Sequence, residues 1–229
     1  MNSGLLDREN TVSKEELHDL YKNHEVSAHG VLHRTLSILP QQNVVQEFLE
    51  DRKALEIASG TFVRGMSYAN GRYSDEAISC LKSCGIVYGR TTNSTQKFGF
   101  PDDFMKWHPT CHHSDCIHNG ERFLKQLDGY FACPRLFYVW GHSYEFNNDN
   151  NWDMIEQFCK MMSGNDEIWY ATNIEIYEYI TAQKQLIISA DNKHIHKIGY
   201  FTKKCYFADA TLGYVTFRKA CGEGILATS

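Results

Sequence analysis

The stretch LFYVW at residues 136–140 decides how the rest of the chain is interpreted. Five consecutive apolar or aromatic residues without polar alternation are typical of a β-strand that is buried on both faces, as in a parallel sheet covered by helices. Residues 24–28, 61–68, 86–89 and 167–171 predict further short strands. Helical patterns separate these strands. Strands that alternate with helices at this spacing predict an α/β fold with a parallel sheet or barrel.

The predicted helices carry apolar side chains at helical spacing, and two of them begin with recognisable capping residues. The first begins at Thr11 or Ser13 and ends near Asn23, and the helix that begins at Ser74 stops at Gly85. The remaining helices are predicted over residues 43–58, 121–130, 153–162 and 173–183.

Length and composition exclude several classes of protein. A chain of 229 residues suits one domain or one domain with a short appendage, and 42% hydrophobic residues allow a real core. The 23 basic and 28 acidic residues give a net charge of -5, which argues against nucleic-acid binding. No apolar run reaches the roughly 18–20 residues that span a bilayer, and the first residues lack a signal peptide. We therefore expect a cytoplasmic protein without nucleic-acid or membrane partners.

The eight cysteines are too sparse for a disulfide scaffold, so we expect reduced thiols. Four of them lie among apolar or helix-forming neighbours and are interpreted as small buried residues. These are Cys80, Cys84, Cys133 and Cys159.

Polar residues that directly follow the predicted strands are the first candidates for chemistry, because sites in parallel α/β folds lie past the carboxyl ends of strands. His29 follows the first strand and residues 68–71 follow the second. Residues 90–92 follow the third, and His142 follows the buried strand soon after Trp140. Two of these four positions contain histidine.

His29 and His33 are four residues apart, so a helical turn would place both imidazoles on one side, where they can hold a divalent ion such as zinc. The spacing alone also fits two unrelated histidines. His142 is either a structural histidine or a general acid or base that titrates near neutral pH. The residues around Ser143 lack the G-x-S-x-G pattern, so a serine hydrolase finds no support.

Two other groups of residues are open to more than one interpretation. The stretch CHHSDCIH at residues 111–118 is dense in metal-capable side chains, but no second, well-separated ligand couple accompanies it. It is either a chance cluster in a loop, a substrate contact or a small zinc module. Aromatic rings near the strand ends either belong to the core or stack on sugar rings. They are Trp107, Trp140, Trp152 and Trp169, with Tyr68, Tyr138, Tyr144 and Tyr170.

Several of these segments together resemble the polysaccharide deacetylases, the family of the NodB-homology or carbohydrate esterase family 4 domain. Residues 24–33, HEVSAHGVLH, look like its second motif, whose two histidines are metal ligands. Residues 65–76 resemble a variant of the third motif, and residues 137–142, FYVWGH, resemble the last motif, whose histidine is a general acid. Residues 151–152, residues 168–172 and the helix after them are similar to the usual close of the domain.

The resemblance implies a distorted (β/α) barrel with a divalent metal at the strand carboxyl ends. Its reaction is metal-assisted hydrolysis that removes an acetyl group, as an amide or an ester, from a carbohydrate. Carried over by motif, His29 and His33 would bind the metal, and His142 would be the general acid. The residues that it assigns to substrate and oxyanion are Tyr68, Asn70, Gly71 and Trp140. The expected metal is zinc, with Co, Ni or Mn as alternatives, and the expected partner is an acetylated glycan or a small acetylated amide.

The chain departs from the family pattern in two motifs. The first motif, Thr-Phe-Asp-Asp-Gly, would supply the catalytic base and a third metal ligand, yet the only Asp-Asp pair, Asp102-Asp103, follows the third motif. The usual Arg-Pro-Pro-Tyr of the third motif is also missing, and Arg64 is the nearest arginine before it. Without the base, the chain is predicted to be weakly active or inactive. The alternative is a non-catalytic carbohydrate-binding or interaction domain.

These departures define the expected domain organisation. Residues 1–190 are predicted to form an N-terminally incomplete barrel that lacks the first βα unit, and its open strand edges would favour a homo-oligomer. Residues 191–229 are predicted to be a C-terminal extension. Within it, residues 201–207 and 211–217 are expected to form a β-hairpin.

Overall fold

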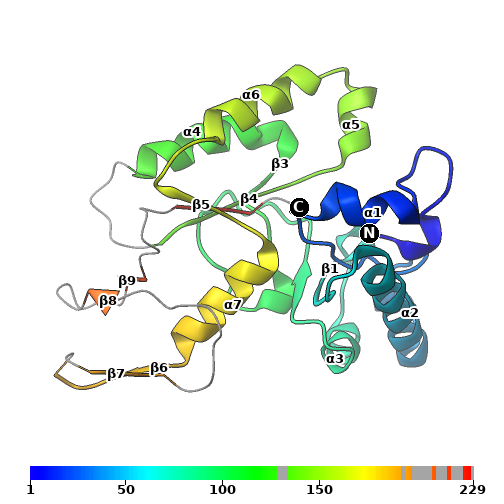
Figure 1. Ribbon diagram of the computed structural model, residues 1–229, viewed down its shortest axis with the longest axis horizontal. Coiled ribbons are helices and arrows are strands. Elements are labelled where there is room, and N and C mark those ends of the chain that lie inside the picture. The colour runs from blue at the N-terminus through cyan, green and yellow to red at the C-terminus, as the bar shows by residue number, and fades with distance from the viewer. Residues whose placement is uncertain (128–133, 192–193, 198–207, 210–215, 218–223, 228–229) are drawn as a thin grey trace.

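The computed structural model describes residues 1–127, 134–191, 194–197, 208–209, 216–217 and 224–227 (Figure 1). The α/β fold expected from the sequence is confirmed, because short parallel strands alternate with helices along the chain. None of the helices in the described ranges has the length and apolar content that crossing a membrane requires.

The strands between the helices pair in parallel. β1 (Gly65–Ser67) pairs with β2 (Tyr88–Arg90), and β3 (Cys111–His112) pairs with β4 (Leu136–Trp140). β10 (Gly224–Ala227) lies between β4 and β5 (Ile168–Ala171) and is parallel to both.

Isolated parallel bridges extend these pairings. One joins Ala28 to Met66 and the other joins Arg90 to Trp107. Of the strand expected over residues 24–28, only the bridge at Ala28 forms. The described strands form small open sheets, and the closed barrel is not seen among them.

Helices cover the strands, and most of their bounds follow the sequence patterns closely. The helix expected over residues 121–130 begins five residues earlier, at Cys116, and the helix at residues 143–148 was not expected. Figure 1 shows α1, α2 and α3 grouped beside β1, and α4 and α6 side by side over β4 and β5. The helices are α1 (Lys14–Tyr21), α2 (Gln41–Ser59), α3 (Asp75–Ser83), α4 (Cys116–Leu127), α5 (Ser143–Asn148), α6 (Trp152–Met162) and α7 (Asn173–Lys184). Short 3-10 turns are η1 (Ser3–Leu5), η2 (Leu36–Ile38), η3 (Ala69–Gly71), η4 (Phe104–Lys106) and η5 (His113–Asp115).

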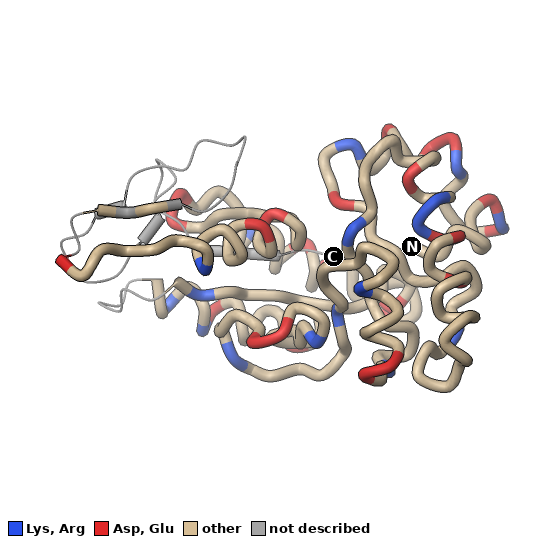
Figure 2. Tube along the Cα trace, turned by 90° about the horizontal axis from the view of Figure 1, so that it is seen from below, with Lys and Arg blue, Asp and Glu red and all other residues tan. Residues whose placement is uncertain are grey.

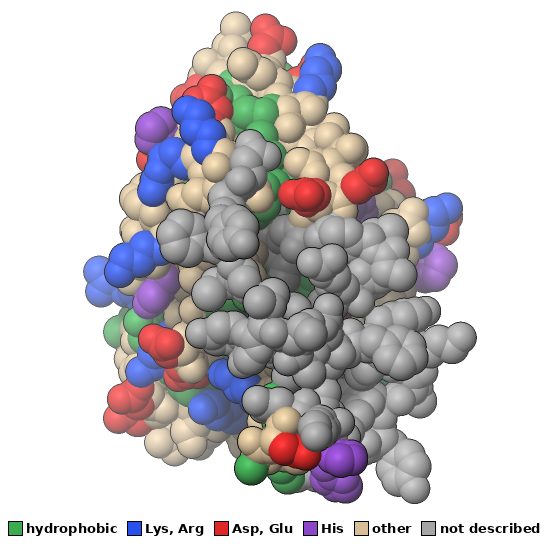
Figure 3. Space-filling view, turned by 90° about the vertical axis from the view of Figure 1, so that its left-hand side faces the viewer, with side chains coloured by type: hydrophobic (Ala, Val, Ile, Leu, Met, Phe, Trp, Pro, Cys, Tyr) green, Lys and Arg blue, Asp and Glu red, His purple; other side chains and the backbone are tan. Residues whose placement is uncertain are grey.

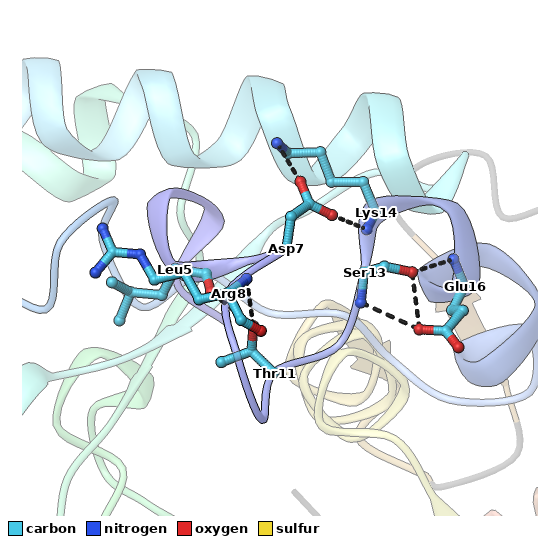
Figure 4. Close-up of polar contacts among 7 residues, drawn as sticks. All are labelled: Leu5, Asp7, Arg8, Thr11, Ser13, Lys14 and Glu16. Atoms are coloured by element: carbon cyan, nitrogen blue, oxygen red, sulfur yellow. Dashed lines mark hydrogen bonds and ion pairs between the residues drawn. The ribbon is translucent and has the colours of Figure 1, made fainter.

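A capping box begins α1, as the sequence predicts. The Ser13 hydroxyl accepts a hydrogen bond from the Glu16 backbone N–H (3.2 Å), and the Glu16 carboxylate accepts one from the Ser13 N–H (3.3 Å) (Figure 4). Asp7 forms an ion pair with Lys14 at 2.7 Å in the same region. These contacts satisfy donors that the first turn of a helix leaves free.

The β4 strand is buried on both faces because its side chains alternate between two parts of the core. Phe137 packs with Phe123 of α4 and Phe158 of α6, whereas Tyr138 packs with Trp107 and the apolar side of α7. A third cluster of buried side chains joins α1, α2 and α3 to β1. The apolar run at residues 136–140 is therefore explained by helices on either side of one strand.

The C-terminal part forms two small antiparallel pairs. β6 (Leu186–Ile188) pairs with β7 (Ile195–Lys197), and β8 (Ala208–Asp209) pairs with β9 (Thr216–Phe217). Most of the predicted hairpin lies outside the described residues, although its last two positions, 216–217, belong to β9.

The predicted burial of the cysteines holds for two of them. Cys80 and Cys84 are buried, whereas Cys159 is exposed on α6, so its predicted burial is wrong. Its neighbour Phe158 is the residue that α6 turns into the core. Cys133 lies outside the described residues.

Charges of both signs are mixed over the molecule. Figure 2 shows acidic and basic residues interspersed along the described trace, and the face in Figure 3 carries both signs around small hydrophobic areas. This distribution agrees with the small net charge of -5.

Candidate functional site

The loop after Ala28 brings His29 and His33 together. Their ring centroids lie 4.6 Å apart with an interplanar angle of 72°. The loop is not the helical turn on which the sequence argument relied, because Gly30 (φ 80°) and His33 (φ 57°) both adopt left-handed conformations. The two imidazoles therefore meet through a tight reversal of the backbone.

A hydrogen bond from Nδ1 fixes how His29 presents its ring. Its Nδ1 lies 2.7 Å from the Ser67 carbonyl oxygen and 2.9 Å from the Ser67 hydroxyl. An Nδ1–H that donates to a carbonyl leaves the lone pair on Nε2, which is the tautomer that binds metals. Burial lowers the pKa of His29 to about 4, although the bond to Ser67 opposes the shift. The ring is therefore neutral near pH 7.

Two carboxylates of α2 hold the backbone of this loop. Asp51, with no exposed surface, accepts hydrogen bonds from the backbone N–H groups of His29 (3.0 Å) and Ser3 (2.7 Å). Glu47, one helical turn earlier, accepts one from the Leu32 N–H (2.8 Å). Sequence reasoning missed both residues. The available signal was a pair of acidic residues, four apart, next to the apolar positions of a predicted helix.

His29 and His33 are two side chains that can bind a divalent metal, and among the described residues no third metal-capable side chain is grouped with them. The oxygens of Asp51 face backbone N–H groups. In the described part of the chain, one group of three metal-capable side chains has its ligand atoms within 4.8 Å of one another, and it consists of His112, His113 and Glu145.

The loop after β1 exposes one of its three predicted substrate residues. Tyr68 is 2% exposed, and its hydroxyl donates to a backbone carbonyl of η4 (2.8 Å). The N–H groups of Tyr68 and Gly71 donate to the carbonyls of Arg90 and Tyr68, both at 2.9 Å. Asn70 is exposed, left-handed (φ 59°), and donates from its side chain to the Thr35 hydroxyl (2.8 Å). The side chain that this loop offers to a ligand is therefore that of Asn70.

His142 follows β4 and belongs to a cluster of histidines around Glu145. Its Nδ1 lies 2.5 Å from Glu145 Oε1. The ring of Trp140 lies 5.9 Å from that of His142 and 4.8 Å from that of His112. In the described part of the chain, the ring and ionic contacts of His142 are with Trp140, Tyr144 and Glu145, and neither His29 nor His33 is among them.

One hydrogen bond connects the loop after β2 with the end of β4. The Trp140 indole N–H donates to the Ser94 hydroxyl at 3.4 Å. The carboxyl ends of β2 and β4 therefore lie on the same side of the molecule. The residues that follow β1 and Ala28 share this side, because those segments are parallel to β2 or to β1.

The cysteines of the 111–118 stretch turn away from the histidines. Cys111 and Cys116 have no exposed surface and pack in the apolar cluster between β4 and α6. Burial raises the pKa of Cys111 to about 12 and that of Cys116 to about 11, so both thiols stay protonated at neutral pH. A zinc module that uses these thiols is not supported, because neither sulfur belongs to the group of metal-capable side chains that the described residues bring together.

The comparisons with known proteins agree with the first part of this description. Residues 3–89 match the family model described as polysaccharide deacetylase. The matched residues, called the deacetylase segment after this similarity, contain His29, His33 and the loop at residues 68–71, whereas Trp140 and His142 lie beyond them. No curated protein matches the chain.

One solved structure shows that the similarity in fold extends past this segment. A crystal structure described as a polysaccharide deacetylase from Mycobacterium smegmatis has 18% identity and a TM-score of 0.54, covering 75% of this chain and 68% of its own. A crystal structure described as a polysaccharide deacetylase from Bacillus anthracis has 21% identity and a TM-score of 0.40, covering 46% of this chain and 34% of its own. A crystal structure described as a CE4-family pseudoenzyme from Bacillus anthracis has 14% identity and a TM-score of 0.41, covering 65% of this chain and 46% of its own. The chain thus spans about one third of the length of the Bacillus anthracis deacetylase.

A partly buried carboxylate connects the deacetylase segment with α7. Glu25 accepts hydrogen bonds from the Tyr88 hydroxyl (2.5 Å) and from the Ile174 N–H of α7 (2.9 Å). Burial raises the pKa of Glu25 above its ordinary value of 4.5, although these hydrogen bonds oppose the shift. The contact joins the start of the chain to its last long helix.

We expect Glu25→Gln to change how the stability of the fold depends on pH. Because the folded pKa is raised, the carboxyl group contributes most below pH 4.5, and its contribution is lost as the pH rises through the folded value. The difference in unfolding free energy between the native chain and the variant should therefore fall as the pH rises from about 4 to about 7. Urea unfolding at several pH values measures it, with the exposed Glu50→Gln as control. Parallel pH profiles for all three proteins would contradict the expectation.

Proposed function

We propose that the chain is a deacetylase-type hydrolytic domain that removes acetyl groups from a carbohydrate, with a divalent metal held by His29 and His33. The observation that carries the proposal is the geometry of this pair, with rings 4.6 Å apart and the Nδ1 of His29 bound to the Ser67 carbonyl. The family match covers both histidines. We also infer that the parallel strands belong to a distorted barrel over residues 1–190, as the family fold implies.

Each residue of the site would have a separate role in the reaction. A divalent metal, most simply zinc, polarises an acetyl carbonyl and lowers the pKa of bound water when it is present. His29 and His33 would hold it as neutral imidazoles, and Asp51 would keep the His29 backbone in place. Asn70 would contact the substrate beside them, because it is the exposed side chain of its loop.

His142 is the candidate proton donor to the leaving group. Its Nδ1 faces Glu145, so the opposite ring nitrogen would carry the proton to the amine or alcohol. Glu145 is a positioning residue in this scheme, because it would set the tautomer and orientation of His142. The scheme requires that His142 and the His29–His33 pair reach one substrate from the same side of the sheet.

Two features predict that activity is low. The Thr-Phe-Asp-Asp-Gly motif does not occur in the 229 residues, so the base of the family reaction has no counterpart. Two imidazoles without a carboxylate also hold a metal more weakly than a complete site. The second candidate function is therefore non-catalytic carbohydrate binding. The exposure of Tyr144 (58%) and Trp152 (47%) near His142 favours it, because flat exposed rings suit sugar faces.

An assay of the full chain with Zn²⁺ and acetylated chitooligosaccharides tests the proposal. We expect slow acetate release that depends on Zn²⁺ and falls to background when His29→Ala and His33→Ala are combined. The matched control combines His18→Ala and His24→Ala, because both of these side chains are exposed histidines of the same segment. That control should release acetate at the native rate.

Calorimetric titration with the same oligosaccharide separates the two candidate functions. Binding without Zn²⁺-dependent acetate release would favour the non-catalytic domain and reject the hydrolase. An absence of both signals would reject both functions. Acetate release that is equal in the native chain and the His29/His33 double variant would show that the metal pair has been misplaced.

A further inference from the structure

Three side chains outside the deacetylase segment converge on one point. His112 Nε2 lies 3.2 Å from Glu145 Oε2, and His113 Nε2 lies 3.4 Å from the same oxygen. The two imidazole rings lie 4.0 Å apart. Each residue therefore directs one potential ligand atom at a common space.

These separations match the edges of a tetrahedral zinc site. Zinc binds histidine nitrogen and carboxylate oxygen at roughly 2.0–2.2 Å, and neighbouring ligand atoms in a tetrahedron are then about 3.4 Å apart. The two distances to Glu145 Oε2 fall close to that value. Two histidines and one glutamate form a ligand set that zinc enzymes use with the fourth position left to water.

The fold holds the two histidines in place. His112 ends β3 and His113 begins η5, so both follow one strand. A Cβ at Gly141 would lie 1.9 Å from His113 Nδ1, so this glycine makes room for the ring. His113 Nδ1 is buried without a hydrogen-bond partner in the described structure, which leaves Nε2 as the nitrogen that meets Glu145. The ring cannot turn its other nitrogen to solvent without leaving its pocket.

Glu145 reaches the histidines from the first turn of α5. Its Oε1 pairs with His142 Nδ1 at 2.5 Å, and its Oε2 faces the other two rings. His142 thus holds one oxygen of the Glu145 carboxylate, and the other oxygen points at two ligand nitrogens. Metal sites need such supporting contacts to orient their ligands. The Glu145 and His112 side chains keep 23% and 24% of their surface exposed, so an ion can enter.

We propose that His112, His113 and Glu145 form a binding site for a divalent transition metal of the zinc class, separate from the His29–His33 pair. The proposal does not depend on deacetylase activity. It differs from a cysteine-containing module at residues 111–118, because the ligands come from two histidines of that stretch and a glutamate of α5. The competing explanation is an ion-pair cluster in which protonated histidines neutralise Glu145.

Cobalt titration of the full chain tests the site, because Co²⁺ in a tetrahedral site gives visible absorption bands. We expect such bands in the native chain and their loss in Glu145→Gln, which keeps the size of the side chain but removes its charge. Glu156→Gln on α6 is the matched control, because Glu156 is an exposed glutamate paired with Lys160. Combining His29→Ala and His33→Ala should leave the bands in place. Circular dichroism confirms that each variant is folded.

Zinc stoichiometry, measured by competition with a chromophoric chelator, gives a second readout. We expect the loss of one bound Zn²⁺ in Glu145→Gln and in the combined His112→Ala and His113→Ala variant. Bands and stoichiometry that survive these changes, or native protein that binds no Co²⁺, would overturn the proposal. Loss of the Co²⁺ bands in both double-histidine variants, the one at His29 and His33 and the one at His112 and His113, would show one shared site. That result would also contradict the proposal.

Discussion

Replacing Gly65 by alanine is expected to lower the unfolding free energy of the chain by about 3 kcal/mol or more. This is the upper end of the loss that an extra group causes when it is forced into a packed core. A Cβ at Gly65 would lie 1.8 Å from the ring of Tyr88 on the neighbouring strand. Tyr88 has no room to retreat, because it is fully buried and its hydroxyl contacts both Glu25 (2.5 Å) and Ser27 (2.8 Å). Urea unfolding followed by circular dichroism measures the loss.

Gly99→Ala is the matched control for this experiment. No atom lies within 4 Å of a Cβ built at Gly99, and its backbone is not left-handed, so alanine is accommodated without a clash. We expect the control to unfold within about 0.5 kcal/mol of the native chain. Equal stability of Gly65→Ala and Gly99→Ala would show that β1 and β2 do not pack as described.

Gly65 also links the packing of β1 and β2 to the histidine loop. Gly65 begins β1 and allows Tyr88 of β2 to lie across it, which fixes how the two strands approach each other. The strand then ends at Ser67, whose carbonyl oxygen receives the His29 side chain. Gly65, which the packing of the strands requires, thus lies two positions before Ser67, which contacts the His29 side chain.

Local patterns were enough for α1, α2, α3, α6 and α7 and for the most apolar strand. The capping residues Ser13 and Ser74 predict the starts of α1 and α3, because a cap depends only on the next few residues. The run at residues 136–140 is a strand with the predicted bounds. α5 was missed, since six residues with one buried side chain, Phe146, give no helical periodicity.

Contacts between distant segments could not be predicted in the same way. The proximity of His29 and His33 was expected from their spacing, but the reversal that produces it depends on left-handed backbone at His33. The pairing of His112 and His113 with Glu145 crosses more than thirty residues of sequence. Such a pairing follows from the parallel arrangement of β3 and β4, which no local pattern reveals.

Asp51→Asn is the second change with a large expected effect, a loss of about 3 kcal/mol in unfolding free energy. Both carboxylate oxygens of Asp51 accept backbone N–H groups, one from Ser3 and one from His29. An asparagine of the same shape has one oxygen and one NH₂ group. One buried backbone donor would therefore face another donor, and the charge that strengthens both hydrogen bonds would be gone.

The same substitution should weaken metal binding at His29 and His33, because the His29 backbone loses its fixed position. Zn²⁺ affinity at that pair is expected to fall about tenfold or more, the range seen when contacts that orient metal ligands are removed. Glu50→Gln is the control, since it lies one residue earlier on α2, is exposed and undergoes the same change of charge. If Asp51→Asn and Glu50→Gln were equally stable and bound Zn²⁺ equally well, Asp51 would not be the residue that ties α2 to the histidine loop.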